Sequence, residues 1–382
     1  MKRIAIFCDG TWNRADAATP THVVRLAQSV APEGPGGAAQ VVLYIPGVGV
    51  GQGVTWAARA SDRIMGGAFG WGLDTRIVEA YRSLIFTFEP GDELFIFGFS
   101  RGAYTARSLA GLIRSAGIPP ATATSRIPQA MEMYRARGPD THPDSEASML
   151  FRAGLSPDTP TSETEREWRL ARGMEDRPAL SIAYLGVYDT VGALGLPGFL
   201  GALPRLVNRR YAFHDTELSR SVRAARHAVA VDERRRHFPP ALWSNLARLN
   251  GERKGAAAPY RQEWFPGNHG IVGGSGRVPE LSAFPTAWIA EGAEAEGLAF
   301  RPDRLAAFTR CADATVDDMG AAQRPALSNL WGLMLADREL PADPETGTPD
   351  PATVNAAARA RLQQTDWRPP TLAPLAHTLT DN

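Results

Sequence analysis

The chain has 382 residues, of which 44% are hydrophobic, so it can bury a large core as one domain with insertions or as several smaller domains. Its 41 Lys and Arg residues are balanced by 41 Asp and Glu residues, which argues against nucleic acid as a partner because phosphate binding needs a basic surface. The two cysteines exclude a disulfide framework, and no apolar run is long enough for a signal peptide or a transmembrane segment, so we expect a chain that is cytoplasmic when made.

Short runs of β-branched and aromatic residues, each bounded by Gly, Pro or Asp, predict buried strands. In chain order they are Ile4–Cys8, Val41–Ile45, Leu94–Phe97, Ile182–Tyr188, Ala228–Val231 and Glu263–Phe265. Helical spacing lies between many of these runs. It is shared by Ile77, Tyr81, Leu84 and Ile85, by Ala106, Leu109, Ala110 and Ile113, and by Leu218, Val222 and Ala225. The alternation of strand and helix predicts an α/β fold with a mostly parallel sheet.

Two stretches interrupt this alternation. Residues 119–178 are rich in Pro, Thr, Arg and Glu, with one helix expected around Ile127–Arg137, and we interpret them as an insertion that covers a sheet edge as a lid. Residues 192–211 are richer in Leu and Pro and are expected to line a substrate entrance. After Leu340 the segment PADPETGTPDPA predicts a surface loop.

The stretch Gly98-Phe99-Ser100-Arg101-Gly102 has the pattern Gly-x-Ser-x-Gly, between a predicted strand and a predicted helix. In that setting the serine occupies a sharp, strained turn, and the glycines on either side let strand and helix approach each other. A serine in an ordinary turn would match the same five letters, but the flanking elements favour a nucleophile. The motif therefore predicts an α/β-hydrolase-like fold in which Ser100 attacks the substrate.

A serine nucleophile needs a histidine to accept its proton and a carboxylate to orient that histidine, and in this fold the chain order is Ser, Asp or Glu, then His. We expect His269 to be the base, because it follows a late strand in the glycine-rich loop WFPGNHGIVGGSG. Structural or surface roles are expected for the other downstream histidines, which are His142, His214, His227, His237 and His377.

Two aspartates end predicted strands and are candidates for the orienting carboxylate. Asp189 ends SIAYLGVYD and leads into an apolar segment, where a buried carboxylate needs a partner such as an imidazole N–H. Asp232 ends HAVAVD and is followed by Glu233 and three arginines, so an ion pair would account for it. We favour Asp189 and keep Asp232 as the alternative acid.

The N-terminal loop Asp9-Gly10-Thr11 resembles that of phosphatases with an Asp-x-Asp-Gly-Thr motif, but Phe7 replaces the first aspartate, the attacking group in those enzymes. In a hydrolase, a backbone N–H near Gly10 or Thr11 would pair with that of Arg101 to form the oxyanion hole. Asp9 would tie the loop through hydrogen bonds or contact substrate. The glycine-rich stretches lack a nucleotide-binding motif, and no metal-binding motif is present, so we expect no cofactor and no metal.

Several blocks together resemble a known family, the uncharacterised α/β-hydrolase family that includes the catalytic domains of type VI secretion phospholipase effectors. They include FCDGTWN, GGAFGWGLDTRIVEAYRSL, GDELFIFGFSRGAYTARSLAGLI, LGVYDTVGALG and EWFPGNHGIVGG. The resemblance implies that Ser100, Asp189 and His269 occupy the family's catalytic positions. Two departures stand out: Tyr188 where the family often has Trp, and Gly270-Ile271 where it often has Ser-Asp after the histidine.

The likeness covers about residues 1–300, expected to form the α/β-hydrolase catalytic domain, with 119–178 and 192–211 as lid-like insertions and 301–382 as a C-terminal extension of helices and loops packed on it. We expect a serine hydrolase that cleaves carboxylic esters. The resemblance implies lipid or phospholipid substrates, peripheral contact with a membrane, and export by a system that needs no signal peptide. The alternatives are a catalytically silent binding module with the same fold, or a hydrolase of another acyl bond.

Overall fold

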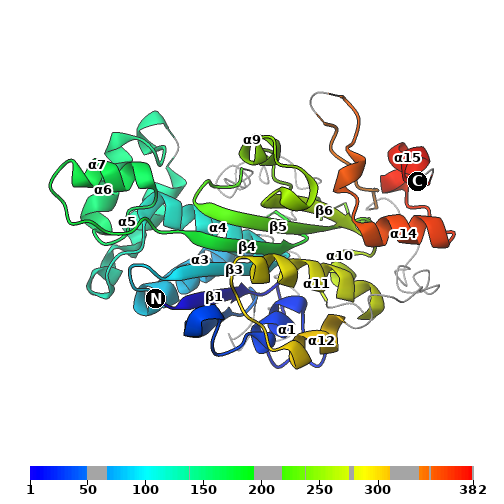
Figure 1. Ribbon diagram of the computed structural model, residues 1–382, viewed down its shortest axis with the longest axis horizontal. Helices are drawn as coiled ribbons and strands as arrows, with labels where there is room; N and C mark the ends of the chain where they lie inside the picture. The colour runs from blue at the N-terminus through cyan, green and yellow to red at the C-terminus, as the bar shows by residue number, and fades with distance from the viewer. Residues whose placement is uncertain are drawn as a thin grey trace.

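The computed structural model describes residues 1–49, 67–136, 138–192, 217–236, 238–274, 279–309, 335–343 and 346–380. Within these residues, six strands form one sheet in the order β2-β1-β3-β4-β5-β6, and all neighbouring strands are parallel (Figure 1). The strands are β1 (Arg3–Cys8), β2 (Gln40–Ile45), β3 (Glu93–Phe99), β4 (Ile182–Tyr188), β5 (Val222–Ala230) and β6 (Tyr260–Phe265). Helices cover both faces of the sheet, which confirms the predicted α/β-hydrolase-like fold.

The helices differ widely in length. The longer ones are α1 (His22–Ser29), α3 (Gly67–Thr87), α4 (Arg101–Ala116), α5 (Ile127–Arg135), α6 (Glu146–Leu155), α7 (Glu163–Leu170), α11 (Pro279–Ala295), α12 (Pro302–Thr309) and α14 (Ala356–Gln364). Short ones are α9 (Leu246–Asn250), α10 (His269–Val272) and α15 (Ala376–Thr380), with 3₁₀ turns at η1 (Pro35–Gly37), η2 (Ala121–Arg126), η3 (Pro139–Thr141), η5 (Gly255–Ala257), η7 (Pro351–Thr353) and η8 (Pro370–Leu375).

A hydrophobic core lies on each face of the sheet and follows the pleat of the strands. In β1, Ile4 and Ile6 belong to the core shared with α3 and α4, whereas Ala5 and Phe7 belong to the core shared with α1 and α11. In Figure 1, α1, α11 and α12 lie together below the sheet. Burial on both faces explains why β1, β3 and β4 read as continuous apolar runs rather than as alternating ones.

The strand order reverses next to β1, and this reversal positions the candidate site. The chain passes from β1 to the edge strand β2 and then returns to β3 on the other side of β1. In open parallel sheets, ligands bind beyond the carboxyl ends of the strands at such a reversal. Asp9 follows β1 and Ser100 follows β3, so both lie at this point of the sheet.

One segment predicted as a helix is a strand. The spacing of Leu218, Val222 and Ala225 fits a helical face, yet residues from Val222 onward form β5, paired with both β4 and β6. Apart from Arg223, every residue of β5 is buried. A strand without a polar face shows no alternation, so its apolar positions also fit a helical period. The predicted strand Ala228–Val231 covers only its last part.

The insertion 119–178, expected as a lid, contacts the end of α4 that is farther from Ser100. It packs around the C-terminal end of α4, where Ser156 Oγ donates to Ala116 O at 2.7 Å and Ile118 N–H donates to Thr159 Oγ1 at 2.9 Å. Because α4 begins next to Ser100 and its 16 residues span roughly 24 Å, these two contacts lie at the opposite end of that helix from Ser100. In Figure 1, α5, α6 and α7 lie toward the same side of the view as the chain's N-terminus.

Two helices of this insertion, α6 and α7, were not expected. Their interface holds a buried ionic cluster, in which Glu165 pairs with Arg152 at 2.8 Å and with Arg169 at 2.7 Å. All three side chains are buried. The second expected lid, 192–211, lies outside the described residues except for Gly192.

The described part of the C-terminal extension packs on the sheet edge formed by β6. Asn355 N–H donates to Trp264 O at 3.0 Å, and Thr371 Oγ1 donates to Val231 O at 3.0 Å. A separate apolar cluster joins the two parts and consists of Val229, Val231, Trp264, Leu340, Val354, Ala358, Leu362, Leu372, Leu375 and Leu379. These contacts cover β6, which would otherwise expose unpaired backbone groups.

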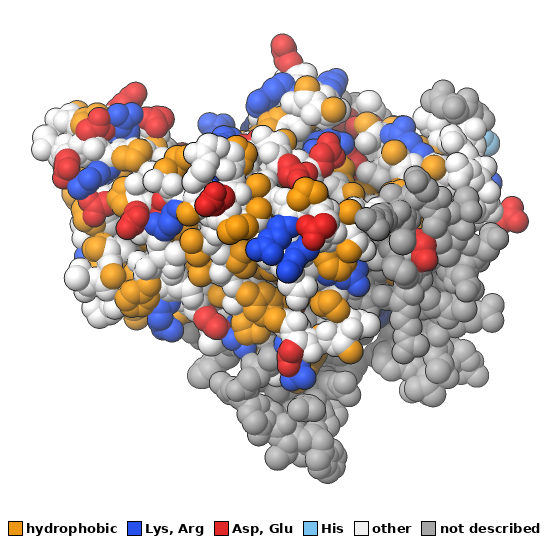
Figure 2. Space-filling view, turned by 60° about the horizontal axis from the view of Figure 1, so that its bottom comes forward, with side chains coloured by type: hydrophobic (Ala, Val, Ile, Leu, Met, Phe, Trp, Pro, Cys, Tyr) orange, Lys and Arg blue, Asp and Glu red, His pale blue; other side chains and the backbone are white. Residues whose placement is uncertain are grey.

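The surface carries charges of both signs. Figure 2 shows one face, on whose described part basic and acidic side chains lie beside one another among hydrophobic ones. This mixture agrees with the equal numbers of basic and acidic residues in the whole chain. Among the described residues, no helix combines the length and the hydrophobicity needed to cross a membrane.

Candidate active site

Ser100 lies on a sharp turn between β3 and α4. Its backbone has φ 58° and ψ −121°, a left-handed conformation that is strained for a residue with a side chain. The flanking glycines make the turn possible: a Cβ on Gly98 would lie 2.5 Å from Gly102 O, and a Cβ on Gly102 would lie 2.2 Å from Cys8 O. The Gly-x-Ser-x-Gly spacing therefore has a steric cause, and the turn presents the serine at the carboxyl end of the sheet.

The structure brings Ser100, His269 and Asp189 into one hydrogen-bonded chain. His269 Nε2 lies 2.8 Å from Ser100 Oγ, and His269 Nδ1 lies 2.5 Å from Asp189 Oδ2. All three side chains are buried. A proton on Nδ1 that is donated to the carboxylate leaves Nε2 free to accept the serine hydroxyl proton, which is the arrangement that activates a serine.

The loop that carries His269 is held from several sides. Asn268 caps α10 by accepting the Ile271 N–H at 3.1 Å, and the backbone N–H of His269 donates to Glu233 Oε2 at 3.3 Å. The imidazole packs between two aromatic rings, with centroid distances of 4.7 Å to Phe99 and 5.0 Å to Phe238. The buried side chain of Ile271 and the Asn268 cap thus anchor the loop at the position where the family often has Ser-Asp.

Asp232, the alternative acid, supports this loop instead of contacting the imidazole. Its Oδ2 accepts the Gly267 N–H at 2.7 Å, and its Oδ1 accepts the indole N–H of Trp367 at 2.9 Å. The ion pair that the sequence suggested for Asp232 is formed by its neighbour, since Glu233 pairs with Arg235 at 2.7 Å.

Arg338 is a site residue that the sequence did not reveal. Its Nη1 donates to Asp189 Oδ1 at 2.6 Å, and its Nη2 donates to Asp189 Oδ2 at 2.9 Å. It comes from the C-terminal extension, 149 residues away from Asp189 in the chain. The one hint in the sequence is indirect: a buried carboxylate needs more than one imidazole to satisfy its two oxygens.

Charge and burial set the protonation of this site. Burial by itself would raise the pKa of Asp189, but the charge of Arg338 and the hydrogen bond with His269 outweigh it and hold the pKa well below its ordinary value. Burial lowers the pKa of His269, and the hydrogen bond and charge of Asp189 only partly offset this. Asp189 is therefore ionised and His269 neutral near neutral pH, as a serine-activating pair requires.

The loop after β1 is tied by Asp9. The Asp9 carboxylate accepts hydrogen bonds from Gly10 N–H at 2.7 Å, from Thr21 Oγ1 at 2.8 Å and from the Tyr44 hydroxyl at 2.8 Å. These bonds support the first of the two roles considered for Asp9, tying the loop. Because the Gly10 N–H donates to Asp9, it is not directed at an oxyanion in this arrangement, and of that pair Thr11 is the candidate donor that remains.

The described histidines other than His269 lie elsewhere. His227 is in the middle of β5 rather than at a strand start, where its Nε2 accepts the Thr190 N–H at 3.1 Å. Burial, together with the charge of Arg107, lowers its pKa to about 3, so it acts as a neutral hydrogen-bonding side chain. His142 and His377 are exposed. His214 and His237 lie outside the described residues.

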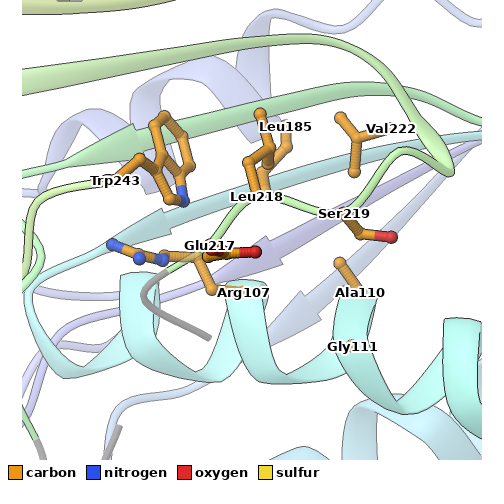
Figure 3. Close-up of a pocket in the computed structure, with 9 residues that line it drawn as sticks. All are labelled: Arg107, Ala110, Gly111, Leu185, Glu217, Leu218, Ser219, Val222 and Trp243. Carbon is orange, nitrogen blue, oxygen red and sulfur yellow. The ribbon is translucent and has the colours of Figure 1, made fainter. Parts of the chain in front are cut away.

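A small pocket lies beside the middle of α4 (Figure 3). It is lined by Arg107 and Ala110 of α4, Leu185 of β4, Val222 of β5 and Trp243, among others. Its volume of about 20 Å³ holds about one water molecule, and Ser100 does not line it. It is therefore not a place for an ester substrate. Among the described residues, no group of His, Cys, Asp or Glu is arranged to hold a metal ion.

Comparisons with known proteins give matches of three kinds. Residues 2–292 match the family described as "T6SS, Phospholipase effector Tle1-like, catalytic domain". The uncharacterized protein YEL023C of Saccharomyces cerevisiae is 28% identical over 244 residues, which cover 62% of this chain and 32% of that protein.

Two solved structures also match. One shows the Tle1 effector bound to the VgrG spike from the type 6 secretion system, with 18% identity, a TM-score of 0.37 and coverage of 72% of this chain and 51% of that one. The other is an uncharacterized protein from Pseudomonas aeruginosa, with 19% identity, a TM-score of 0.38 and coverage of 80% and 47%.

This chain thus spans about a third of the yeast protein and about half of each solved chain. The family match, in contrast, extends over well more than half of this chain, from residue 2 to residue 292. By that match the protein belongs to the family of Tle1-like phospholipase effector catalytic domains of type VI secretion.

Proposed function

We propose that this protein is a serine hydrolase that cleaves carboxylic esters of lipids, phospholipids among them, through an acyl-enzyme on Ser100. The observation that carries the proposal is the hydrogen-bonded chain from Ser100 through His269 to Asp189, on a strained turn at the carboxyl end of β3. Membership of a family of phospholipase effectors supports lipase or esterase chemistry and a lipid as the substrate.

The proposed reaction has two halves. As Ser100 Oγ attacks the ester carbonyl carbon, its proton passes to His269 Nε2, and Asp189 stabilises the imidazolium that forms. The tetrahedral intermediate collapses, the carbon–oxygen bond to the alcohol breaks, and His269 returns the proton to the departing alcohol. Water then attacks the acyl-Ser100 ester with the same base, which releases the carboxylic acid and restores the serine.

The negative oxygen of the tetrahedral intermediate needs donors in fixed positions. We assign them to the backbone N–H groups of Arg101 and Thr11. Arg101 is the first residue of α4, where the partial positive charge of a helix N-terminus favours a developing anion. Thr11 belongs to the loop that the Asp9 carboxylate ties, and this loop passes close to Gly47, where a Cβ would lie 1.8 Å from Gly10 O.

Replacement of the serine tests this proposal. We expect Ser100→Ala to lower kcat on p-nitrophenyl butyrate and on phosphatidylcholine vesicles by at least about a thousandfold, because the acyl-enzyme cannot form. Ser83→Ala is the matched control, since Ser83 lies on α3, where its hydroxyl donates to Glu79 O of the same helix at 3.0 Å. Equal turnover by wild type and Ser100→Ala, with unchanged melting temperatures, would refute the proposal.

A separate proposal concerns the export of the protein from the cell. We infer from the family that a type VI secretion system, which needs no signal peptide, exports the protein that carries this domain. A secretion assay with an intact and a disabled secretion system would detect the protein in the medium only in the first case.

A further inference from the structure

The buried guanidinium of Arg338 has partners on three separate segments. Besides both oxygens of Asp189, it donates to Ala230 O, at the end of β5, at 2.8 Å and to Phe238 O, also at 2.8 Å. Phe238 in turn packs on the ring of His269. Arg338 thus ties the carboxylate to the end of β5 and to the segment whose Phe238 packs on the imidazole.

The segment that supplies Arg338 is itself fixed beside the site. Leu335 pairs with Arg235 as an isolated β-bridge, and Ala336 N–H donates to Arg234 O at 2.8 Å. Leu340, two residues after the arginine, is buried in the apolar cluster over β6. The segment from Leu335 to Leu340 lies beyond residue 292, where the match to the family's catalytic domain ends.

Arg338 changes the charge balance around His269. With Asp189 alone, protonation of the imidazole would complete a neutral buried ion pair, which favours the imidazolium. With Arg338 bound to the same carboxylate, the pair of Asp189 and Arg338 is already neutral, so a proton on His269 would leave a net positive charge in a buried site. Such a charge is costly, and the neutral imidazole is favoured.

Other charged groups near the ring do not reverse this balance. They are Glu233 and Arg235, which follow β5, besides Asp189 after β4 and Arg338 in the C-terminal extension. Glu233 accepts the backbone N–H of His269, but it is also paired with Arg235 at 2.7 Å, so those two charges largely offset each other.

We propose that Arg338 is a positioning residue for the reaction: by binding both oxygens of Asp189 it orients the carboxylate and neutralises its charge, so that His269 stays unprotonated, and able to accept the Ser100 proton, at acidic pH. The catalytic consequence rests on the proposed function, whereas the effect on the protonation of His269 does not. A serine hydrolase built this way keeps its base active below the pH at which an ordinary histidine becomes protonated.

The pH dependence of kcat/KM tests the catalytic part. As the pH is lowered, kcat/KM of the wild type should fall to half its plateau, the midpoint of the profile, only below about pH 6.5, which is the ordinary pKa of a histidine side chain. Arg338→Gln and Arg338→Met both remove the charge, and each should move this midpoint up by about one pH unit. Arg338→Lys keeps the charge but loses the two-pronged contact, so its midpoint should stay near that of the wild type while the plateau of kcat falls. Arg248→Gln, which removes an exposed arginine of α9 paired with Glu217 at 2.9 Å, is the matched control and should leave the profile unchanged.

A second readout does not depend on turnover. In protein labelled with ¹⁵N-histidine, with the His269 signal assigned by its loss in His269→Gln, the NMR titration midpoint should follow the same order among the variants. A wild-type midpoint at or above about 6.5 overturns the inference even if no variant folds. The inference is also overturned if Arg338→Gln and Arg338→Met leave the NMR titration midpoint of His269 at the wild-type value. An inactive wild type with the expected NMR shifts would instead refute the proposed function alone.

Discussion

Gly102 shows how one residue fixes the candidate site. A Cβ there would lie 2.2 Å from Cys8 O and 2.4 Å from Asp9 O, both backbone atoms that cannot rotate away. We expect Gly102→Ala to push α4 away from the end of β1, to destabilise the protein by about 1–3 kcal/mol, and to lower esterase activity because Ser100 and the Asp9 loop separate. Thermal unfolding and kcat/KM measure the two effects.

Gly154 is the matched control for that substitution. It also lies in a helix, α6, but a Cβ at this position would meet nothing within 4 Å. Gly154→Ala should be neutral or raise the free energy of unfolding by up to about 1 kcal/mol, with activity unchanged. A Gly102→Ala protein as stable and active as Gly154→Ala would contradict the steric explanation of the motif.

Residues whose roles follow from local pattern could be predicted from the sequence, and residues whose roles follow from long-range contact could not. Ser100 lies in a short motif between a strand and a helix, and Asp189 and His269 follow strands that the apolar runs marked. Arg338 lacked any such signal, because its role depends on an ion pair between segments 149 residues apart. The sequence predicted that Asp9 could tie its loop, but not that the Gly10 N–H would be one of its donors, since this depends on which way the loop turns.

At the scale of elements, the interface between α6 and α7 is held by the buried carboxylate of Glu165 and its two arginines. We expect Glu165→Ala to destabilise the protein by about 3–5 kcal/mol, because Arg152 and Arg169 would be left buried without their partner. Since this cluster lies at the far end of α4 from Ser100, the folded protein should keep the kcat/KM and pH profile of the wild type. Chemical denaturation and ester hydrolysis below the transition measure these effects.

The control for this prediction is Glu163, which lies two residues earlier on α7 and has an exposed side chain paired with Arg166 at 3.1 Å. Glu163→Ala should change the free energy of unfolding by less than about 1 kcal/mol. Loss of activity in well-folded Glu165→Ala protein would mean that the insertion acts on substrate after all, as a lid would.

Prediction of elements succeeded where hydrophobic pattern decides structure. The apolar runs located strands in the centre of the sheet, such as β1 and β4, because a short apolar run bounded by turn residues is typical of a strand that is buried on both faces. Apart from Arg223, the first part of β5 is also buried on both faces, so its apolar positions fit a helical period as well, and the sequence predicted a helix there. Helices α6 and α7 were missed because their buried arginines and glutamate look like surface residues in the sequence.

At the scale of the whole molecule, the C-terminal extension connects the edge of the sheet to the candidate site. Leu362 of α14 is 2% exposed within the cluster that includes Trp264, and the same extension supplies Arg338. We expect Leu362→Ala to destabilise the protein by about 2–5 kcal/mol through the cavity it leaves. Activity and tryptophan fluorescence should be lost at the same denaturant concentration, because sheet, extension and site unfold together.

Leu150 provides the comparison, since it is 62% exposed on α6 and its replacement by alanine should change stability by no more than about 0.5 kcal/mol. Separate transitions for activity and fluorescence in Leu362→Ala would show that the extension unfolds on its own.

The central claim is that Ser100 is activated by the relay through His269 and Asp189, and covalent labelling tests it most directly. A fluorophosphonate reacts efficiently only with an activated serine, so intact mass spectrometry of the treated wild type should show a single adduct, which peptide mapping places on Ser100. The adduct should be absent from Ser100→Ala and form far more slowly in His269→Gln. An unlabelled wild type, or labelling that persists at the same rate in His269→Gln, would contradict the account.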